Sequence, residues 1–304
     1  MSTRTGERAA MNGAVVVGVD GSRTAWAALA WAAGDAGRRE LPLRIVHVRE
    51  PWLAERPLSA SSDQETLTER CDTLLAAAAD RAHELAPGVR TSTALVTGAV
   101  IERLRSESET ADTVVVGSRG LGGFAGLVLG SVGFGLAGYA ESPVVVVRRP
   151  PRDGSGEIVV GYDASPCADM ALEYALAQAV ARRARLRVLY GRRYPYTAPH
   201  PVGYGPLPVG EADEIGRRLA LRREKYPEVE LIESIVDEHP VPALAAASRV
   251  ADLVVVGSRG LGGFTSAMLG SVSRGVLQRA HCPVSVVSAP RRRPLRRTLG
   301  ARVR

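Results

Sequence analysis

The chain has 304 residues, a length typical of two domains, and 45% of them are hydrophobic, as in ordinary globular proteins. It contains no run of 18 apolar residues, and its polar N-terminus, MSTRTGERAAMNG, lacks the apolar core of a signal peptide, so we expect a cytoplasmic protein without a membrane span. The net charge is +7, but residues 290–304 alone hold seven of the 39 basic residues and none of the 32 acidic ones. The remaining chain is therefore nearly neutral, and nucleic-acid binding is not expected except through this basic tail.

Three cysteines, Cys71, Cys167 and Cys282, are far apart and odd in number. This pattern favours neither a disulfide framework nor a zinc site. We expect them to be small buried side chains.

Two segments of the chain repeat each other closely. Residues 111–132 (ADTVVVGSRGLGGFAGLVLGSV) and 251–272 (ADLVVVGSRGLGGFTSAMLGSV) share seventeen of 22 positions. Earlier, VVVGVDGS at 15–22 matches IVVGYDAS at 158–165. The long period predicts a tandem domain duplication rather than a solenoid.

The duplication divides the chain into four parts. A disordered N-terminus at 1–12 precedes a first domain at 13–149, and a second domain at 156–289 precedes a disordered basic tail at 290–304. The boundary between the domains falls in the Pro/Gly-rich stretch RRPPRDGSG.

Each copy alternates strands and helices. Short runs rich in Val and Ile, bounded by turn residues, predict the strands. In the first copy we expect strands at 14–20, 43–48, 91–96, 112–117 and 143–148, with helices at 23–37, 63–86, 99–109 and 131–141. In the second copy we expect strands at 157–163, 185–190, 229–236, 252–257 and 283–288, with helices between them.

This alternation predicts the fold class. Runs such as VVVG and VVVV are apolar on both faces, as in parallel strands covered on both sides. We therefore expect two tandem doubly wound α/β domains, each with a five-stranded parallel sheet flanked by helices, in a Rossmann-like arrangement. Long loops at about 49–62 and 191–210 are either functional or flexible surface segments.

A glycine motif, G-x2-G-x9-G-S, occurs once in each copy after a predicted buried strand and before a predicted helix. Glycines let the backbone approach phosphate oxygens closely, and a helix N-terminus offers free N–H groups to an anion. The motif residues are Gly117, Gly120, Gly130 and Ser131, and again Gly257, Gly260, Gly270 and Ser271. The two serines can contact phosphate or merely cap the helix.

Other residues of these loops are candidate nucleotide contacts too: Ser118, Arg119, Gly123 and Val132 in the first copy, and Ser258, Arg259, Gly263, Val272 and Ser273 in the second. The two arginines can grip phosphate or point to solvent.

An acidic residue ends the first strand of each copy, as Asp20 and Asp163. In open α/β sheets, ligands bind beyond the carboxyl ends of the strands where the strand order reverses. Each carboxylate is therefore expected to face the glycine loop and to contact a base, a ribose or a metal; the alternative is a helix N-cap. Gly18 and Gly161, two residues earlier, are expected to leave room for the base.

The end of the second strand is a further candidate contact. Val48 could present backbone groups to an adenine edge, whereas the second copy has Tyr190 and Gly191 there.

Other chemistry is not indicated. GFGLAG at 133–138 fits G-x-G-x-x-G, but it falls inside a predicted helix rather than between a strand and a helix. We read it as a weakened helix. No Walker loop, HExxH motif or Ser/His/Asp set emerges, so no catalytic residue is assigned.

The motifs VVVGVDGS, ADTVVVGSRG and G-x2-G-x9-G-S, followed by a helix and SPVVVV or CPVSVV, resemble the universal stress protein family over nearly the whole chain. The resemblance implies an adenine nucleotide alpha hydrolase-like fold, ATP at the loops with Mg²⁺, dimer-like pairing through the last strands, and a homodimer. It also implies a role in stress response or dormancy. The family pattern Gly-Ser-Val-Ser is kept at Ser273, whereas Gly133 departs from it.

Three functions stay open: an ATP-binding regulator, a slow Mg-dependent ATPase or phosphotransferase, and an interaction scaffold without nucleotide. The intact loops favour the first, and the absence of a phosphate-gripping lysine weakens the second. Differences between the copies predict two ATP sites of unequal affinity.

Overall fold

The computed structural model describes residues 13–50, 62–121, 129–150, 154–191, 211–260 and 269–289. The first half contains β1 (Val15–Gly18), α2 (Arg23–Arg38), β2 (Leu43–Arg49), α3 (Ser62–Leu85), β3 (Thr91–Thr97), α4 (Val100–Ser108), β4 (Thr113–Gly117), α5 (Ser131–Tyr139) and β5 (Val144–Val147). The second contains β6 (Glu157–Gly161), α6 (Pro166–Arg182), β7 (Arg185–Gly191), α7 (Glu211–Lys225), β8 (Leu231–Val236), α8 (Pro240–Ala247), β9 (Leu253–Gly257), α9 (Ser271–Arg279) and β10 (Val284–Val287).

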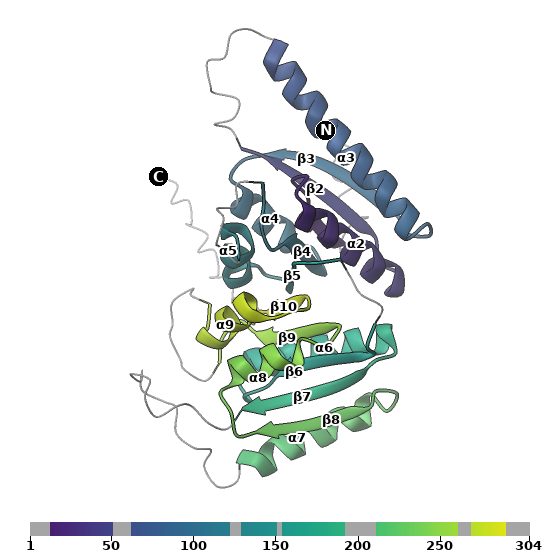
Figure 1. Ribbon diagram of the computed structural model, residues 1–304. Coiled ribbons are helices and arrows are strands. Elements are labelled where there is room, and N and C mark those ends of the chain that lie inside the picture. The colour runs from purple at the N-terminus through teal and green to yellow at the C-terminus, as the bar shows by residue number, and fades with distance from the viewer. Residues whose placement is uncertain are drawn as a thin grey trace, which may run out of the picture.

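The strands form one ten-stranded sheet in the order β3-β2-β1-β4-β5-β10-β9-β6-β7-β8 (Figure 1). Within each half all pairings are parallel, which confirms the predicted doubly wound α/β class. The halves join where β5 meets β10 in antiparallel register, with Val145 opposite Ser285. These two residues are counterparts in the duplication, so the halves are related by a pseudo-twofold axis at this strand pair, as the family resemblance implied.

Both faces of the sheet are buried, because the apolar side chains of its short strands point alternately to each side. One core lies between the sheet and α2, α3, α6 and α7, and includes Leu29 and Leu172. The other lies beneath α4, α5, α8 and α9, and includes Leu104 and Leu244. Each core contains residues of both halves, so the halves share both cores.

The cysteines are unpaired. Cys167 and Cys282 are buried as expected, whereas Cys71 on α3 is only partly buried. Burial raises the pKa of the Cys282 thiol to about 12, which keeps it protonated and unreactive.

The GFGLAG segment lies inside α5, as predicted, but its central glycine has a packing role. A Cβ on Gly135 would lie 2.7 Å from Ile101 Cδ1 of α4. The counterpart Gly275 in α9 would meet Val241 Cγ2 of α8 at the same 2.7 Å. The glycine therefore permits close helix contact in both halves, and it is not a weakness peculiar to the first.

A polar cluster joins α2 to α6 across the pseudo-twofold axis. Asp35 is fully buried, and its Oδ1 accepts a hydrogen bond of 2.9 Å from Arg182 Nη2. Its Oδ2 accepts from Gln178 Nε2 and from Arg39 Nη1, each at 3.3 Å. Arg182 also lies 5.1 Å above the ring of Trp31, in cation–π contact. Asp35 and Gln178 are counterparts, so a neutral amide stands where exact duplication would have placed a second carboxylate.

Helix α8 begins at an ionisable cap. His239 is its N-cap, and its Nδ1 accepts a hydrogen bond from Val241 N at 3.1 Å. This bond requires an unprotonated Nδ1. Burial, with the nearby charge of Arg279, lowers the pKa of His239 below its ordinary value of 6.5.

This cap predicts an acid-sensitive component of stability. A depressed His pKa means that the folded state favours the neutral ring, so the cap is fully stabilising above the unfolded pKa and is lost as pH falls through the folded pKa. We expect the melting temperature to drop between about pH 7.5 and about pH 5.5 by less in His239→Asn, which keeps a cap without titrating, than in the natural protein. Equal drops in thermal denaturation would contradict this role.

Candidate functional site

The site predicted at the carboxyl ends of the central strands is assembled in the structure. β1 and β4 are neighbours, with Gly18 opposite Val116, so the turn after β1 and the loop after β4 leave the same edge of the sheet. The Asp20 carboxylate bridges them: Oδ1 accepts from Ser22 N at 3.0 Å, and Oδ2 accepts from Leu121 N at 3.0 Å. Asp20 and the glycine loop therefore face one another as expected.

Asp20 and Asp163 are not helix N-caps. That position belongs to Ser22 in α2 and Ser165 in α6, whose hydroxyls accept from Ala25 N and Ala168 N at 3.2 Å. In the second half Asp163 Oδ1 accepts from Ser165 N at 3.0 Å, as Asp20 does from Ser22. The N-cap alternative is thus wrong for both acids.

The first two motif glycines serve close contacts within the protein. A Cβ on Gly117 would lie 2.7 Å from the backbone carbon of Thr24, and one on Gly257 would lie 2.9 Å from that of Cys167. These glycines let the first turn of α2 or α6 pack on the strand end. A Cβ on Gly120 would lie 2.6 Å from Asp20 Oδ2.

Gly260 repeats this arrangement with Asp163 Oδ2 at 2.3 Å from an added Cβ. The second motif glycine is therefore required by the carboxylate that lies against it, in addition to any approach of phosphate. This pairing explains why the acid and the glycine recur together in both halves.

Gly18 and Gly161 admit side chains of the helices that cover this face of the sheet, and their contact with a base stays a prediction. A Cβ on Gly18 would meet Leu104 Cδ1 of α4 at 3.2 Å, and one on Gly161 would meet Leu244 Cδ1 of α8 at 2.9 Å. The space beside each glycine is filled by a buried leucine from the opposite helix layer.

The end of each loop closes back on its start. Gly130 N donates to Ser118 O at 2.7 Å, and Gly270 N donates to Ser258 O at 2.8 Å. Gly130 and Gly270 are the N-caps of α5 and α9, and no side chain caps either helix. The backbone N–H groups of the first helical turn are therefore free of side-chain caps, which is the arrangement that binds anions.

Ser131 and Ser271 occupy the first helical position, and both are exposed. Because glycine holds the N-cap position, the capping alternative for these serines is wrong. Their hydroxyls lie beside the uncapped helix start, where a bound anion would meet them.

Several other predicted contacts are internal to the fold. Ser118 and Ser258 are buried, and Val132 and Val272 pack on the core beneath α5 and α9. Ser273 is 3% exposed, and its hydroxyl donates to Gly257 O at 2.5 Å, so it ties α9 to the end of β9. Gly133, the counterpart of Ser273 in the first half, has no side chain with which to make this bond.

The remaining predicted contacts are distributed as follows. The Arg119 side chain is exposed and that of Arg259 partly so, while Val48 is partly buried against the core. Gly123 and Gly263 lie outside the described residues.

Cations border the first site. Arg148, at the end of β5, donates through Nη1 to Ala280 O at 2.8 Å. Burial, together with the charges of Arg119 and Arg149, lowers the pKa of Arg148. Arg119 and Arg148 are therefore close enough to influence each other electrostatically.

Residues that the motif did not include hold the loop. The Thr24 hydroxyl donates to the Arg119 carbonyl and accepts from Arg119 N at 3.3 Å. Ser22 Oγ donates to the same carbonyl at 3.1 Å, and Ser165 Oγ to Arg259 O at 3.4 Å. The signal for them was the hydroxyl pattern in DGSRT, two and four residues after the aspartate.

The turns after β1 and β6 differ in backbone strain. Gly21 has φ +85°, whereas its counterpart Ala164 has φ +61°, a left-handed conformation that disfavours a side chain. We expect Ala164→Gly to stabilise the protein by ~1 kcal/mol and Gly21→Ala to destabilise it by a similar amount. Urea denaturation of this matched pair checks the expectation; shifts of the same sign in both variants would refute it.

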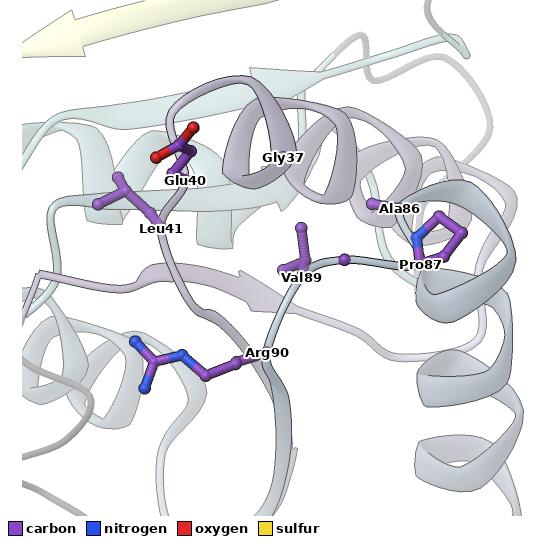
Figure 2. A pocket seen from close by; sticks show the side chains of 8 residues that line it. Gly37, Glu40, Leu41, Ala86, Pro87, Val89 and Arg90 are labelled. Carbon is purple, nitrogen blue, oxygen red and sulfur yellow. The ribbon is translucent and has the colours of Figure 1, made fainter.

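A separate cavity of about 370 Å³ lies near the amino ends of β2 and β3, away from the glycine loops. Figure 2 shows the residues that line it. It is formed where α2 ends and where the turn from α3 enters β3. Its lining residues are Gly37, Glu40, Leu41, Ala86, Pro87, Gly88, Val89 and Arg90. None of them belongs to the predicted site.

In the described part of the chain, no helix is long and apolar enough to cross a membrane. Among those same residues, no group of three or more His, Cys, Asp or Glu side chains could hold a metal ion.

The architecture defines a class: a tandem pair of doubly wound α/β domains, each with an acid and a glycine loop at the switch point of its sheet. The chain belongs to the universal stress protein family, whose profile matches residues 11–148 and again 155–288.

Relatives of the same tandem length support this membership. Universal stress protein Rv1996 of Mycobacterium tuberculosis is 34% identical over 302 residues, covering 91% of this chain and 95% of its own. A universal stress protein of Mycolicibacterium smegmatis is 33% identical over 293 residues, with 90% and 96% coverage.

A solved structure of similar length shares the fold. The crystal structure of a universal stress protein from Archaeoglobus fulgidus has a TM-score of 0.69 at 22% identity, covering 92% of this chain and 98% of its own. Another universal stress protein, solved in complex with cAMP, covers 45% of this chain and 98% of its own at 28% identity, with a TM-score of 0.35.

Proposed function

We propose that each half of the chain binds one ATP molecule at the carboxyl edge of its sheet, and that the protein acts as a nucleotide-dependent regulator in stress response or dormancy. The observation that carries the proposal is the pairing, in both halves, of a glycine-flanked loop with a helix start that no side chain caps. The triphosphate would accept hydrogen bonds from the N–H groups of Ser131 or Ser271 and their neighbours.

The charge of the first site fits this ligand. Arg119 and Arg148 place positive charge beside the loop, which favours a polyanion over a neutral ligand. Mg²⁺ would enter with the nucleotide, held largely by phosphate oxygens, as is usual for this ion in nucleotide sites.

The test is the nucleotide content of the purified protein. We expect denaturation to release ATP at up to two molecules per chain, and added ATP to raise the melting temperature of stripped protein. cAMP, which a similar universal stress protein binds, serves as the comparison ligand. The absence of released nucleotide, together with no thermal shift from ATP, would refute the proposal.

The same preparation distinguishes a regulator from a slow ATPase. A regulator retains ATP with negligible phosphate release over hours. Steady phosphate release that is lost when Asp20→Ala and Asp163→Ala are combined would instead assign hydrolysis to these sites.

A further inference from the structure

We propose that Thr24 is the positioning residue that holds the phosphate loop of the first half, and that its replacement by Cys167 makes the second half the weaker ATP site. This inference rests on the proposed function and assigns an order to the two sites.

The hydrogen bonds of Thr24 hold the start of the loop in place, an arrangement that we call the clamp. Its hydroxyl bonds to both the carbonyl and the N–H of Arg119, which fixes one peptide group on either side of a single loop residue. Ser22 reinforces the same carbonyl, and Asp20 holds Leu121 N. Arg119 and Leu121 are thereby attached to the turn after β1 and to the first turn of α2.

The second half lacks the central part of this clamp. Cys167 occupies the position of Thr24, and its Sγ lies 3.9 Å from Ser258 Oγ as a weak acceptor. Within the described residues, the Arg259 carbonyl accepts a side-chain hydrogen bond only from Ser165, at 3.4 Å. A thiol is a poor donor and acceptor, so it cannot restrain the peptide on both sides as a hydroxyl does.

Ser273 does not replace the missing clamp. Its hydroxyl bonds to the Gly257 carbonyl at the end of β9 and orients the start of α9. This bond does not involve the N–H or the carbonyl of Arg259, whose counterparts on Arg119 are both held by Thr24. The loop of the second half therefore has more conformational freedom to lose when it binds phosphate, and this loss weakens binding.

Single-site backgrounds make the proposal measurable. Gly260→Val leaves only the first site, in which we expect Thr24→Val to weaken ATP binding about tenfold by calorimetry, as for the loss of one or two hydrogen bonds. Thr24→Ser keeps the hydroxyl and is expected to restore most of the affinity, a rescue that lost packing alone would not give. Gly120→Val leaves only the second site, where Cys167→Thr is expected to tighten binding several-fold.

A second readout is independent of nucleotide. Hydrogen exchange of the Arg119 amide in ligand-free protein is expected to speed up in Thr24→Val and to stay slow in Thr24→Ser. If the natural protein binds no ATP, the proposed function is wrong. The hydrogen exchange of the Arg119 amide then still tests whether Thr24 holds the loop. If ATP binds but Thr24→Val changes neither affinity nor exchange, or if Cys167→Thr does not tighten the second site, the clamp is overturned and the proposed function stands.

Discussion

Replacing Asp35 by alanine is expected to destabilise the protein by about 3–5 kcal/mol, the cost of removing one partner from a buried ion pair. Asp35 is 0% exposed and lies 2.9 Å from Arg182, whose own side chain is 12% exposed. Without the carboxylate, the guanidinium of Arg182 stays in the interface between α2 and α6 with no acid to compensate it. The midpoint of chemical denaturation, followed by circular dichroism, measures the effect.

An exposed ion pair provides the matched control. Arg81 and Glu84 are 2.6 Å apart, but their side chains are 53% and 64% exposed. Glu84→Ala should therefore change stability by less than about 0.5 kcal/mol, because solvent screens such a pair. Equal effects of Asp35→Ala and Glu84→Ala would show that the buried cluster does not hold the two halves together.

The second large effect concerns nucleotide binding. Gly120→Val combined with Gly260→Val is expected to weaken ATP binding at least about 100-fold, or ~2.7 kcal/mol. The new Cβ atoms would come within 2.6 Å and 2.3 Å of the carboxylate oxygens of Asp20 and Asp163. The carboxylates must then leave their places beside the loops, and the added methyl groups cover backbone that phosphate would approach.

Gly88→Val is the control for this variant. Nothing lies within 4 Å of a Cβ at Gly88, which is in the turn between α3 and β3 at the opposite edge of the sheet. It should bind ATP like the natural protein. Calorimetric titration measures the ATP affinity of each variant, and circular dichroism establishes that each variant folds. Undiminished affinity in a folded double variant would contradict the assignment of the loops as phosphate-binding.

The sequence predicted the secondary structure more accurately than it predicted the contacts of the site residues. Strands such as VVVG and VVVV could be located because their apolar character is local and continuous. Their ends shifted by one or two residues, as at β1, where Val15–Gly18 is shorter than the expected 14–20. The contacts of individual site residues were harder to predict: Asp20 was placed correctly beside the loop, whereas the leucine that lies against Gly18 was not foreseen.

The reason is the distance along the chain between interacting groups. Asp20 and Leu121 are 101 residues apart, and Arg182 and Asp35 are 147 residues apart. A motif states which residue types recur, but not which side chain fills the space beside a glycine. Thr24 therefore remained outside the predicted site although it contacts the loop directly.

The amino-acid sequence by itself determined the duplication, the doubly wound fold and the position of the glycine loops, because strand periodicity, turn residues and repeated motifs are properties of short segments. Only the tertiary structure showed which residues each repeated motif contacts. It placed Asp20 against Gly120, set Asp35 opposite Gln178 at the pseudo-twofold axis, and gave the first loop a hydroxyl clamp that the second lacks. These contacts could not be predicted from the repeat because each of them forms between residues that are far apart in the chain.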